Sequence, residues 1–484
     1  MSTTVKISLL NLPETFSVPQ SLGDQLRDLL HYFRTGEIHA GSAFPPLGLL
    51  YLASVLKEAG YEVSVLDAAV KGWNLERVEK WVRKEDPEVL GLSTFSGNLG
   101  HVVELASRAK EARPEVKIIL GGPQATFTAD PLLRKYSFVD LVVRGEAEEI
   151  IVGALRVLEG VEKPGEVRGI SYRVGDQVVH NPPAGPVLDL DALPRPDRSL
   201  LVAEYSSTLG PLSFSSGKST TVLTSRGCPY RCTFCSCTAF RGNLCKFRSP
   251  ENVVEELEEL EGEGYEEVGF VDDSFTLVRK RVERMCELMR KRKLGLSWWC
   301  ESRVDAVSLE LFREMKRTGC EAVFFGLESG NQRILDYYRK GITPQQSVRA
   351  VEAARKAGLN TTGTFIVGAP VETREEVLQT LRFAGRLRLD AVGAGPLWVY
   401  PGTPLWDDFV SKNPGLGERY WESGFAPVEL GMCSYSEEWF LKEIGRTLRR
   451  FYLNPLYLSD QLFKTLRDPY RRRVLSERLS SLLS

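Results

Sequence analysis

The chain has 484 residues, of which 43% are hydrophobic and 26% charged, so it is long enough for about three domains, or for two and an appendage. This composition is ordinary for a soluble globular protein. The sequence has no run of about 18 apolar residues, which excludes a membrane-spanning protein. The net charge of −2 gives no field for nucleic acid, so we expect no nucleic-acid partner. The first residues carry one lysine and an apolar run too short for a signal peptide. We therefore expect a cytoplasmic protein whose nine cysteines are metal ligands or catalytic groups rather than disulfides.

Short β-rich runs alternate with amphipathic helical runs in residues 1–165. The alternation predicts an α/β domain with a parallel, doubly wound, Rossmann-like (flavodoxin-like) sheet, which binds ligands at the carboxyl ends of its strands. Those ends carry Ser93, Thr94, Gly121, Gly122 and Gly145. The expected strands are 6–11, 61–68, 89–95, 116–122 and 140–146, and the expected helices are 47–60, 75–84 and 99–112.

Residues 166–215 are predicted to connect two domains. They contain a hairpin pattern at 170–179 and an extended linker at 181–197 with five prolines. A second alternating series at 216–405 has six βα units, which predicts a partial (β/α)6 barrel of the TIM type rather than a closed one of eight units. Residues 406–484 are predicted to form a helical C-terminal region. The six expected barrel strands are 219–225, 268–273, 297–303, 322–329, 360–368 and 390–400.

Two helix starts in this second series are marked by capping residues. Ser249-Pro250 places a serine at the N-cap and a proline at the first helical position. Thr373 and Glu376 have the spacing of a capping box.

The segment RGCPYRCTFCSC (226–237) is the strongest functional signal in the sequence. Cys228, Cys232 and Cys235 form a C-x3-C-x2-C pattern directly after the first expected barrel strand. Thiolates suit iron–sulfur clusters, and a cluster normally takes four of them. Three cysteines leave one iron open to bind a substrate or cofactor. The alternative, a zinc site, needs a fourth ligand, and Cys237 offers only an unusually tight C-x-C spacing.

This motif resembles the hallmark of the radical S-adenosylmethionine (radical SAM) superfamily, C-x3-C-x-aromatic-C, with Phe234 as the aromatic residue. The resemblance implies a 4Fe-4S cluster with Cys228, Cys232 and Cys235 as its metal-binding and catalytic residues. It also implies that the open iron chelates S-adenosylmethionine, and that reduction by an external donor of the ferredoxin or flavodoxin type yields a 5′-deoxyadenosyl radical.

Polar residues end the later barrel strands, where the superfamily binds S-adenosylmethionine. Asp272 and Asp273 end the second strand, and Glu301 and Arg303 end the third. Arg303 is expected to pair with the methionine carboxylate in a bidentate way. The alternative for Asp272 or Glu301 is a solvated loop acid. The resemblance implies contacts to S-adenosylmethionine from Phe234, Asp273, Glu301, Arg303, Glu328, Ser329 and Tyr400.

With this barrel downstream, the first domain resembles the cobalamin-binding domain of one large radical SAM subgroup. The matching segments are 44–67, 90–95, 120–126 and 142–148, and the whole resemblance covers about residues 5–405. It implies cobalamin as a third cofactor. The cobalamin contacts that it implies are Ser93, Thr94, Gly121, Gly122, Pro123, Gln124, Gly145 and Glu146.

The chain departs from the older cobalamin fold in one respect. That fold carries D-x-H-x-x-G after its first strand, and the connection from about 12 to 44 lacks this motif. We therefore expect cobalamin to bind without a protein histidine below the cobalt. The four histidines are expected to be surface or satisfied polar residues; they are His31, His39, His101 and His180.

The cysteines outside the motif do not form a second ligand set. Cys286 and Cys320 are predicted to lie in helices as small core residues. Cys237 and Cys245 flank the motif and are expected to be buried, with substrate contact as the alternative.

The function implied by the resemblance is a cobalamin-dependent methyltransferase, of the type called class B, that methylates an unactivated carbon. The same subgroup contains cyclases and other enzymes that form or rearrange carbon–carbon bonds, and these are the first alternative. A cobalamin or redox sensor is an alternative of another class. The substrate is expected to be a small molecule, either lipid-like or a natural-product intermediate.

The C-terminal residues 442–484 hold ten lysines and arginines against four acids, a net charge of +6 that leaves −8 for the remainder. Apolar and aromatic residues are interleaved with these charges. One interpretation is a set of basic amphipathic helices at the inner face of the membrane. The favoured alternative is a helical cap that packs its apolar stripe on the barrel and leaves its basic groups in solvent.

Overall fold

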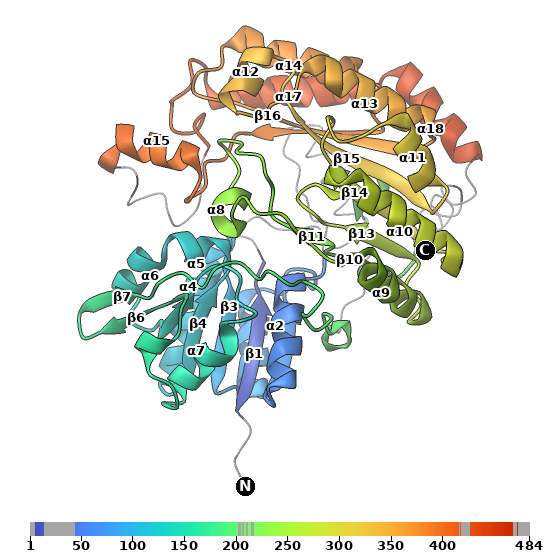
Figure 1. The fold of residues 1–484 in the computed structure, drawn as a ribbon. Helices are drawn as coiled ribbons and strands as arrows, with labels where there is room; N and C mark the ends of the chain where they lie inside the picture. The colour runs from blue at the N-terminus through green and yellow to red at the C-terminus, as the bar shows by residue number, and fades with distance from the viewer. Residues whose placement is uncertain are drawn as a thin grey trace.

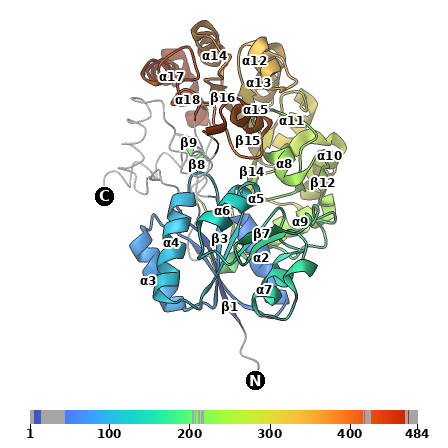
Figure 2. The ribbon, with the colours of Figure 1, turned by 90° about the vertical axis from the view of Figure 1, so that its left-hand side faces the viewer.

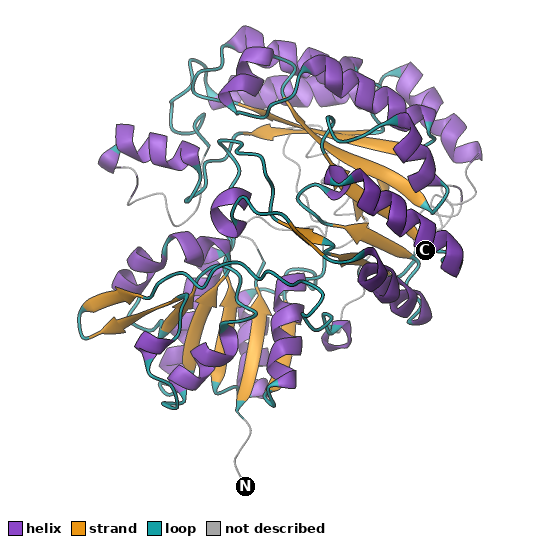
Figure 3. Cartoon of the chain, viewed as in Figure 1, coloured by secondary structure: helices purple, strands orange, loops and turns teal. Residues whose placement is uncertain are grey.

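The computed structural model describes residues 5–13, 44–201, 205, 208–209, 212–213, 217–415, 417, 426–467 and 472. Within these ranges the chain forms two α/β units, one above the other in Figures 1 and 2. In each unit the helices lie against a central sheet (Figure 3). No helix in the described ranges has both the length and the apolar character needed to cross a bilayer.

The first sheet has seven strands in the order β2-β1-β3-β4-β5-β6-β7. The pairings among β1 to β5 are all parallel, and their order is that of a flavodoxin-like fold. The predicted fold of this domain is therefore confirmed. Its parallel strands are β1 (Lys6–Asn11), β2 (Glu62–Asp67), β3 (Val89–Ser93), β4 (Lys117–Gly121) and β5 (Leu141–Val143).

Helices cover both faces of this sheet, which explains why its strands are nearly continuous apolar runs. Leu10 and Leu90 pack on the side of α3 and α4. Ile7 and Leu9 pack on the side of α2 and α7. The helices are α2 (Leu47–Glu58), α3 (Leu75–Glu85), α4 (Leu99–Ala112), α5 (Pro123–Phe127), α6 (Ala129–Lys135) and α7 (Ile151–Leu158).

The predicted hairpin is part of the first sheet rather than of the connector. Its strands β6 (Ile170–Val174) and β7 (Gln177–His180) turn at Gly175, and β6 pairs antiparallel with β5. The predicted domain boundary at residue 165 therefore falls inside this sheet. The proline-rich linker follows from residue 181.

The second sheet has six parallel strands in the order β10-β13-β14-β15-β16-β17, with β10 and β17 at its two edges. The predicted partial barrel is therefore confirmed. Its strands are β10 (Ser219–Val222), β13 (Glu267–Phe270), β14 (Ser297–Ser302), β15 (Cys320–Glu328), β16 (Asn360–Val367) and β17 (Ala391–Pro396).

Two of the outer helices of the barrel begin where the sequence predicts. The Ser249 side chain accepts a hydrogen bond from the Asn252 amide at the start of α9, and Thr373 and Glu376 form the capping box of α14. The helices are α9 (Pro250–Gly262), α10 (Arg279–Arg292), α11 (Leu309–Lys316), α12 (Gln332–Tyr337), α13 (Pro344–Lys356) and α14 (Arg374–Arg386).

Alternate residues of β14 face opposite sides of the barrel wall. Trp298 and Cys300 pack into the core beneath the outer helices. Trp299 lies in a separate aromatic group with Phe44 and Phe324, at centroid distances of 5.3 and 5.2 Å. The barrel interior therefore has an aromatic floor that includes a residue from the first domain.

Beyond the barrel lie α15 (Pro404–Lys412), α17 (Glu437–Tyr452) and α18 (Pro455–Arg467). Phe440, Ile444 and Leu448 of α17 are buried in the barrel core. The helical character of the C-terminal region is thus confirmed for its described residues, whereas 468–471 and 473–484 lie outside them. The remaining short elements are η1 (Pro164–Glu166), η2 (Arg198–Leu200), β8 (Thr208–Leu209), β9 (Leu212–Ser213), β11 (Ser225–Arg226), α8 (Cys237–Arg241), β12 (Lys246–Phe247) and η3 (Phe275–Leu277).

Candidate active site

The cysteine motif lies on a loop that is closed at its base by a short antiparallel ladder. Because β11 pairs with β12, the loop 227–245 leaves the carboxyl end of the barrel as one unit. Cys228, Cys232 and Cys235 lie on this cysteine loop with free, partly exposed thiols. The loop also contains α8, which lies between the two α/β units (Figure 1).

The donor set of the cysteine loop fits three ligands of a 4Fe-4S cluster. Burial raises the pKa of the Cys235 thiol to about 11 and also raises the pKa of Cys228 and of Cys232, while the cations Lys340 and Arg303 oppose the rise at Cys232. Coordination to iron deprotonates such thiols. Cysteine thiolates are the usual ligands of iron–sulfur clusters, and the loop carries three of them within eight positions.

A second segment that the sequence did not predict, the end of α12, holds the middle of the cysteine loop. The Thr233 amide donates to the Tyr338 carbonyl at 2.9 Å. The Phe234 ring meets the Tyr338 ring edge to face, at a centroid distance of 5.2 Å. Phe234 therefore packs against protein and orients the loop, and its contact with S-adenosylmethionine remains a prediction.

The two aspartates that follow β13 have different roles. Asp272 is fully buried and accepts hydrogen bonds from the Thr224 amide at 2.6 Å and the Ser225 hydroxyl at 2.7 Å, so it fixes the base of the loop. The alternative of a solvated acid is wrong for Asp272. Asp273 accepts from the Gly227 amide at 3.0 Å and lies 3.5 Å from Arg241, with a quarter of its side chain exposed. Asp273 therefore borders the cysteine loop with a carboxylate that a ligand can reach.

Glu301 projects from β14 on the same side as Trp299, toward the barrel interior. Its side chain is exposed to solvent, yet desolvation by the surrounding protein, together with the charges of Asp273 and Asp272, raises its pKa to about 7. This combination is expected of a carboxylate that faces a hollow within the protein. Glu301 is thus placed to contact a ligand.

Arg303 is already engaged by protein groups. Its guanidinium donates to both oxygens of Asp305, at 3.0 and 2.9 Å, and to the Lys340 carbonyl at 2.8 Å. It also stacks 3.4 Å from the ring centre of Tyr230 on the cysteine loop. The expected bidentate pairing with a ligand carboxylate would have to displace Asp305, so this geometry favours a role in positioning the loop.

The end of β15 contains a buried ion pair on a strained backbone. Lys340 donates to Glu328 at 2.6 Å, and Glu328 has a left-handed φ of 58° at an irregularity of the strand. Such strain in a residue other than glycine costs about 1–3 kcal/mol and is concentrated at functional sites. Ser329, by contrast, is fully buried and hydrogen-bonded to Thr380 at 2.8 Å. Glu328 therefore remains a candidate ligand contact, whereas the structure does not present Ser329 to a ligand.

The loop after β17 connects the barrel to the first domain. Tyr400 is 38% exposed, and a Cβ placed on Gly402 would come within 2.4 Å of the Phe127 ring. Phe127 ends α5, and its ring lies 6.3 Å from that of Phe240 in α8. α5 follows Gly122 and α8 follows Cys235, so each helix comes directly after expected cofactor contacts. These two helices are therefore in contact.

The carboxyl edge of the first sheet is lined by small residues, as predicted. Gly145 has a φ of 81° with open space where a Cβ would lie, and a Cβ on Gly121 would meet only one carbonyl, at 3.9 Å. Gly122 has another reason to be glycine, because a Cβ there would lie 2.7 Å from the Thr94 carbonyl oxygen. Ser93, Gly121, Pro123 and Gly145 are partly exposed, which fits a shelf for a large planar cofactor.

Two of the predicted cobalamin contacts serve the fold of this edge. Thr94 is fully buried, donates to the Gly121 carbonyl at 2.6 Å and accepts from the Ala125 amide at 2.8 Å. Gln124 is buried and accepts from the Ser96 hydroxyl at 2.6 Å. Their side chains thus hold the shelf together from beneath.

Glu146 joins the two domains and lies away from the shelf. Lys246 approaches it at 3.0 Å, and Arg226 lies 3.5 Å from Glu146 and 2.6 Å from Glu148. All four side chains are nearly fully buried. This interdomain cluster was not predicted from the sequence, because Glu146 was assigned to cobalamin from the resemblance alone. The signal that could have indicated the cluster was Arg226, which precedes the cysteine loop.

Cys286, Cys320 and the described histidines have structural surroundings, whereas Cys237 and Cys245 do not share the burial of Cys286 and Cys320. Cys286 is buried in α10, but Cys320 begins β15, so its predicted place in a helix is wrong while its predicted burial is confirmed. Cys237 and Cys245 are partly exposed rather than buried. The polar roles expected for His101 and His180 are confirmed by hydrogen bonds to the Pro13 carbonyl and the Ser171 hydroxyl, at 2.9 and 2.8 Å, whereas His31 and His39 lie outside the described residues.

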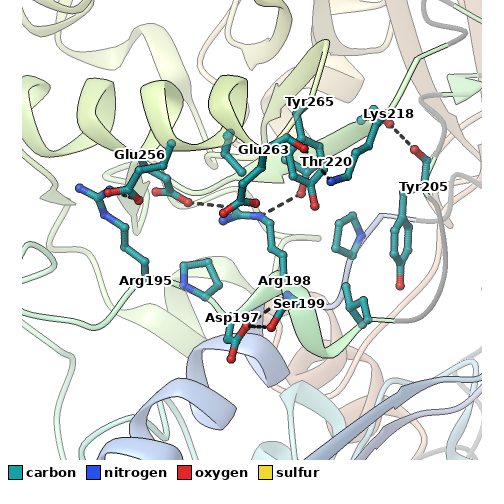
Figure 4. Close-up of a pocket in the computed structure, with 16 residues that line it drawn as sticks. Arg195, Asp197, Arg198, Ser199, Tyr205, Lys218, Thr220, Glu256, Glu263 and Tyr265 are labelled. Carbon is teal, nitrogen blue, oxygen red and sulfur yellow. Dashed lines mark hydrogen bonds and ion pairs between the residues drawn. The ribbon is translucent and has the colours of Figure 1, made fainter.

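A cavity of about 630 Å³ lies at the opposite, amino-terminal end of the barrel strands, between the linker and α9 (Figure 4). Its charged groups pair with one another: Arg198 with Glu256 at 2.8 Å, and Lys218 over the Tyr265 ring at 4.0 Å. This cavity marks where the linker docks on the barrel and is remote from the cysteine loop.

A (β/α)6 barrel that carries three loop cysteines, preceded by a flavodoxin-like domain with a glycine-lined edge, defines the class of radical SAM enzymes with a cobalamin-binding domain. Two family models match the chain: the radical SAM superfamily at residues 222–384 and the B12 binding domain at residues 36–155. The chain is 35% identical over 429 residues to an uncharacterized methyltransferase of Pyrococcus horikoshii, covering 88% of this chain and 91% of the relative. The chain therefore belongs to the radical SAM superfamily, in the branch that binds cobalamin.

Other comparisons agree with this assignment. The chain is 28% identical over 466 residues to the anaerobic magnesium-protoporphyrin IX monomethyl ester cyclase of Rubrivivax gelatinosus, covering 93% of this chain and 81% of the relative. The radical SAM methyltransferase TsrM of Kitasatospora setae has the same fold, with a TM-score of 0.66 at 18% identity, over 84% of this chain and 76% of that one. The protein is an enzyme whose cofactors are a 4Fe-4S cluster, S-adenosylmethionine and cobalamin.

Proposed function

We propose that the protein is a cobalamin-dependent methyltransferase that places a methyl group on an unactivated carbon of a small molecule. The contact between α5 and α8 carries the proposal. α5 begins beside the glycine shelf of the first domain, and α8 follows the cluster cysteines, with Phe127 and Phe240 6.3 Å apart. This contact supports a methyl source and a radical source on facing edges, as group transfer between two cofactors requires.

When bound, the cluster and S-adenosylmethionine supply the radical that removes hydrogen from the substrate carbon, and cobalamin supplies the methyl group. The residues of the chain position these groups. Cys228, Cys232 and Cys235 hold the cluster, while Asp273 and Glu301 offer carboxylates beside the cysteine loop. We assign contacts with S-adenosylmethionine to Asp273, Glu301, Glu328 and Tyr400, and contacts with cobalamin to Ser93, Gly121, Pro123 and Gly145.

The aromatic floor of the barrel favours a substrate with an apolar body. Its partly exposed members are Phe44 and Phe324, which pack on the buried Trp299, and Glu301 lies on the same face of β14 as Trp299. A lipid-like molecule or a natural-product intermediate with a hydrogen-bond donor satisfies both features. The proposal further includes an external electron donor of the ferredoxin or flavodoxin type, and a peripheral position at the inner face of the membrane.

The products of S-adenosylmethionine test the proposal. Anaerobically purified protein with a reconstituted cluster is incubated with reductant, cobalamin and S-adenosylmethionine, and its products are measured by mass spectrometry. Methylation requires both S-adenosylhomocysteine and 5′-deoxyadenosine. A preparation that contains cluster and cobalamin but releases neither product would contradict the proposal and favour a sensor.

A cyclase is the second candidate, and the 28% identity with the Rubrivivax gelatinosus cyclase over most of both chains favours it. The same experiment separates the two candidates. A cyclase releases 5′-deoxyadenosine without S-adenosylhomocysteine, since it consumes no methyl group.

We predict that cobalamin binds without a protein imidazole below the cobalt, because the segment after β1 lacks the D-x-H-x-x-G motif. Electron paramagnetic resonance of the bound Co(II) form checks this expectation. Hyperfine coupling to a nitrogen that is labelled by ¹⁵N-histidine would contradict it.

A further inference from the structure

Helix α18 is docked on the barrel through its polar face. Tyr457 donates to the Asp390 carbonyl at 2.8 Å, Gln461 donates to the Asp390 carboxylate at 2.9 Å, and Lys464 also pairs with that carboxylate. Asp460 lies 3.5 Å from Arg355. These four residues of α18 are spaced as one side of a helix, so the polar side faces the protein.

The apolar side chains of α18 therefore point away from the protein. Five of them, which we call the outer face, are between 50% and 78% exposed: Leu456, Leu458, Leu462, Phe463 and Leu466. Leu453, just before α18, is 63% exposed. A surface helix of a globular protein normally has the reverse arrangement, with its apolar side in the core. The neighbouring helix α17 follows that rule, so the inversion is specific to α18.

The surroundings of the outer face are basic. From residue 442 to residue 468 the sequence has six basic residues and three acids; of these acids, Glu443 pairs with Arg446, and Asp460 pairs with Arg355 and Lys464. Arg446, Arg449, Arg450 and Arg467 are exposed, and the Arg467 guanidinium lies 3.9 Å from the centre of the Phe463 ring. The remainder of the chain is acidic.

We propose that α18 is a membrane-docking helix, whose outer face enters the interface of an anionic bilayer while the arginines of α17 and α18 contact its headgroups. Apolar side chains flanked by basic groups are the usual composition of such an interfacial helix. The inference concerns where the enzyme sits and is independent of which reaction it performs.

A second copy of the chain fits the outer face less well than a bilayer does. A stable interface between proteins usually takes 20–30 residues from each side, and the outer face offers five. A twofold pairing of α18 would also bring like-charged arginines together, which is unfavourable. Anionic headgroups complement the same arginines.

Vesicle flotation of the full chain tests the docking. The protein is mixed at low salt with vesicles of phosphatidylglycerol and phosphatidylcholine, and in parallel with vesicles of phosphatidylcholine alone. We expect recovery with the anionic vesicles only, and at least a tenfold weaker partition for the L462S/F463S/L466S variant. Since these side chains are already exposed, the variant should fold normally, with an unchanged melting temperature and circular dichroism spectrum.

The matched control is the V161S/V174S/L188S variant, which removes three apolar side chains of similar exposure, 59% to 69%, far from α18 in the sequence. It should float as the unaltered protein does. Absence of flotation of the unaltered protein, equal recovery with neutral vesicles, or equal loss in both variants would overturn the proposal. Light scattering provides a further check. If the unaltered protein is a dimer and only the α18 variant is a monomer, the outer face binds a second copy of the chain, and this result would also overturn the proposal.

Discussion

The carboxyl edges of the two sheets are built from opposite kinds of residue. In the first domain the edge is lined by Gly121, Gly122 and Gly145, and its polar side chains are turned inward. In the barrel the edge is charged, and most of its charges are paired within the protein, as in Arg303 with Asp305 and Glu328 with Lys340. The first edge therefore leaves room for a large ligand, whereas the second fixes the cysteine loop through pairs within the protein.

Removal of a cluster cysteine should have the largest effect. We expect Cys228→Ala, Cys232→Ala and Cys235→Ala each to abolish 5′-deoxyadenosine formation, because three thiolates are the whole contribution of the protein to the cluster. The Cys237→Ala variant serves as the control and should retain its iron and sulfide. Iron loss in the Cys237 variant combined with iron retention in the Cys235 variant would show that the ligands are assigned wrongly.

Arg226 links the two domains, and its removal leaves the buried Glu148 without its cation, while Glu146 keeps Lys246. We expect Arg226→Met to lower the free energy of unfolding by about 3–5 kcal/mol, because an uncompensated buried charge is strongly destabilising. Urea denaturation measures this. The exposed pair of Arg279 with Glu283 provides the comparison, and Arg279→Met should cost less than about 1 kcal/mol.

A double variant distinguishes charge pairing from packing at the same place. If buried charge is the cause, R226M/E148Q should recover part of the stability that R226M loses. Equal stabilities of the single and double variants would mean that lost packing explains the effect.

Glu372 lies shortly after β16 and is a buried carboxyl. Its titration should therefore change the free energy of unfolding with pH. Desolvation raises its pKa from 4.5 to about 7, although the Gly368 and Ala369 amides donate to it. A carboxyl with a raised pKa in the folded state stabilises the fold below pH 4.5 and loses that contribution as the pH rises through 7. The Glu372→Gln variant should therefore match the unaltered protein near pH 4.5 and be more stable by roughly 2–3 kcal/mol at pH 8. Urea titrations at both pH values decide this, and parallel curves across the range would contradict it.

The smallest expected effect concerns the glycine shelf. Gly121→Ala adds a methyl group where the protein leaves space, so the fold should be unchanged while cobalamin affinity falls several-fold. Gly122→Ala should instead lower the melting temperature, since its Cβ would clash with the Thr94 backbone. Cobalamin titration followed by visible absorption, together with thermal unfolding, separates the two. Unchanged affinity in the Gly121 variant would place the cofactor elsewhere.

The sequence predicts the elements of both domains because their signals are local. Periodicity locates the strands, and Ser249 and Thr373 mark helix starts through hydrogen bonds that span three residues. The cysteine motif is also local, since its residues lie within eight positions.

What the sequence could not predict depends on partners that are distant along the chain. Arg303 and Ser329 end barrel strands as expected, but the Lys340 carbonyl and the Thr380 hydroxyl already engage them within the protein. Glu146 was assigned to cobalamin, and its pairing with Lys246 arises only when the domains meet. Likewise, the amphipathic pattern of α18 is plain, but the pattern does not say that the polar side is the docked one.

The buried cluster of Arg226, Lys246, Glu146 and Glu148 also limits how the enzyme can move. A hinge motion that separated the domains at this point would expose four charges to partial solvation during each turnover, and the unpaired intermediates would be high in energy. The junction should thus behave as a rigid pivot. Substrate entry and product release then require motion on another side of the barrel, and hydrogen exchange should find the amides of β11 and β12 among the slowest in the molecule.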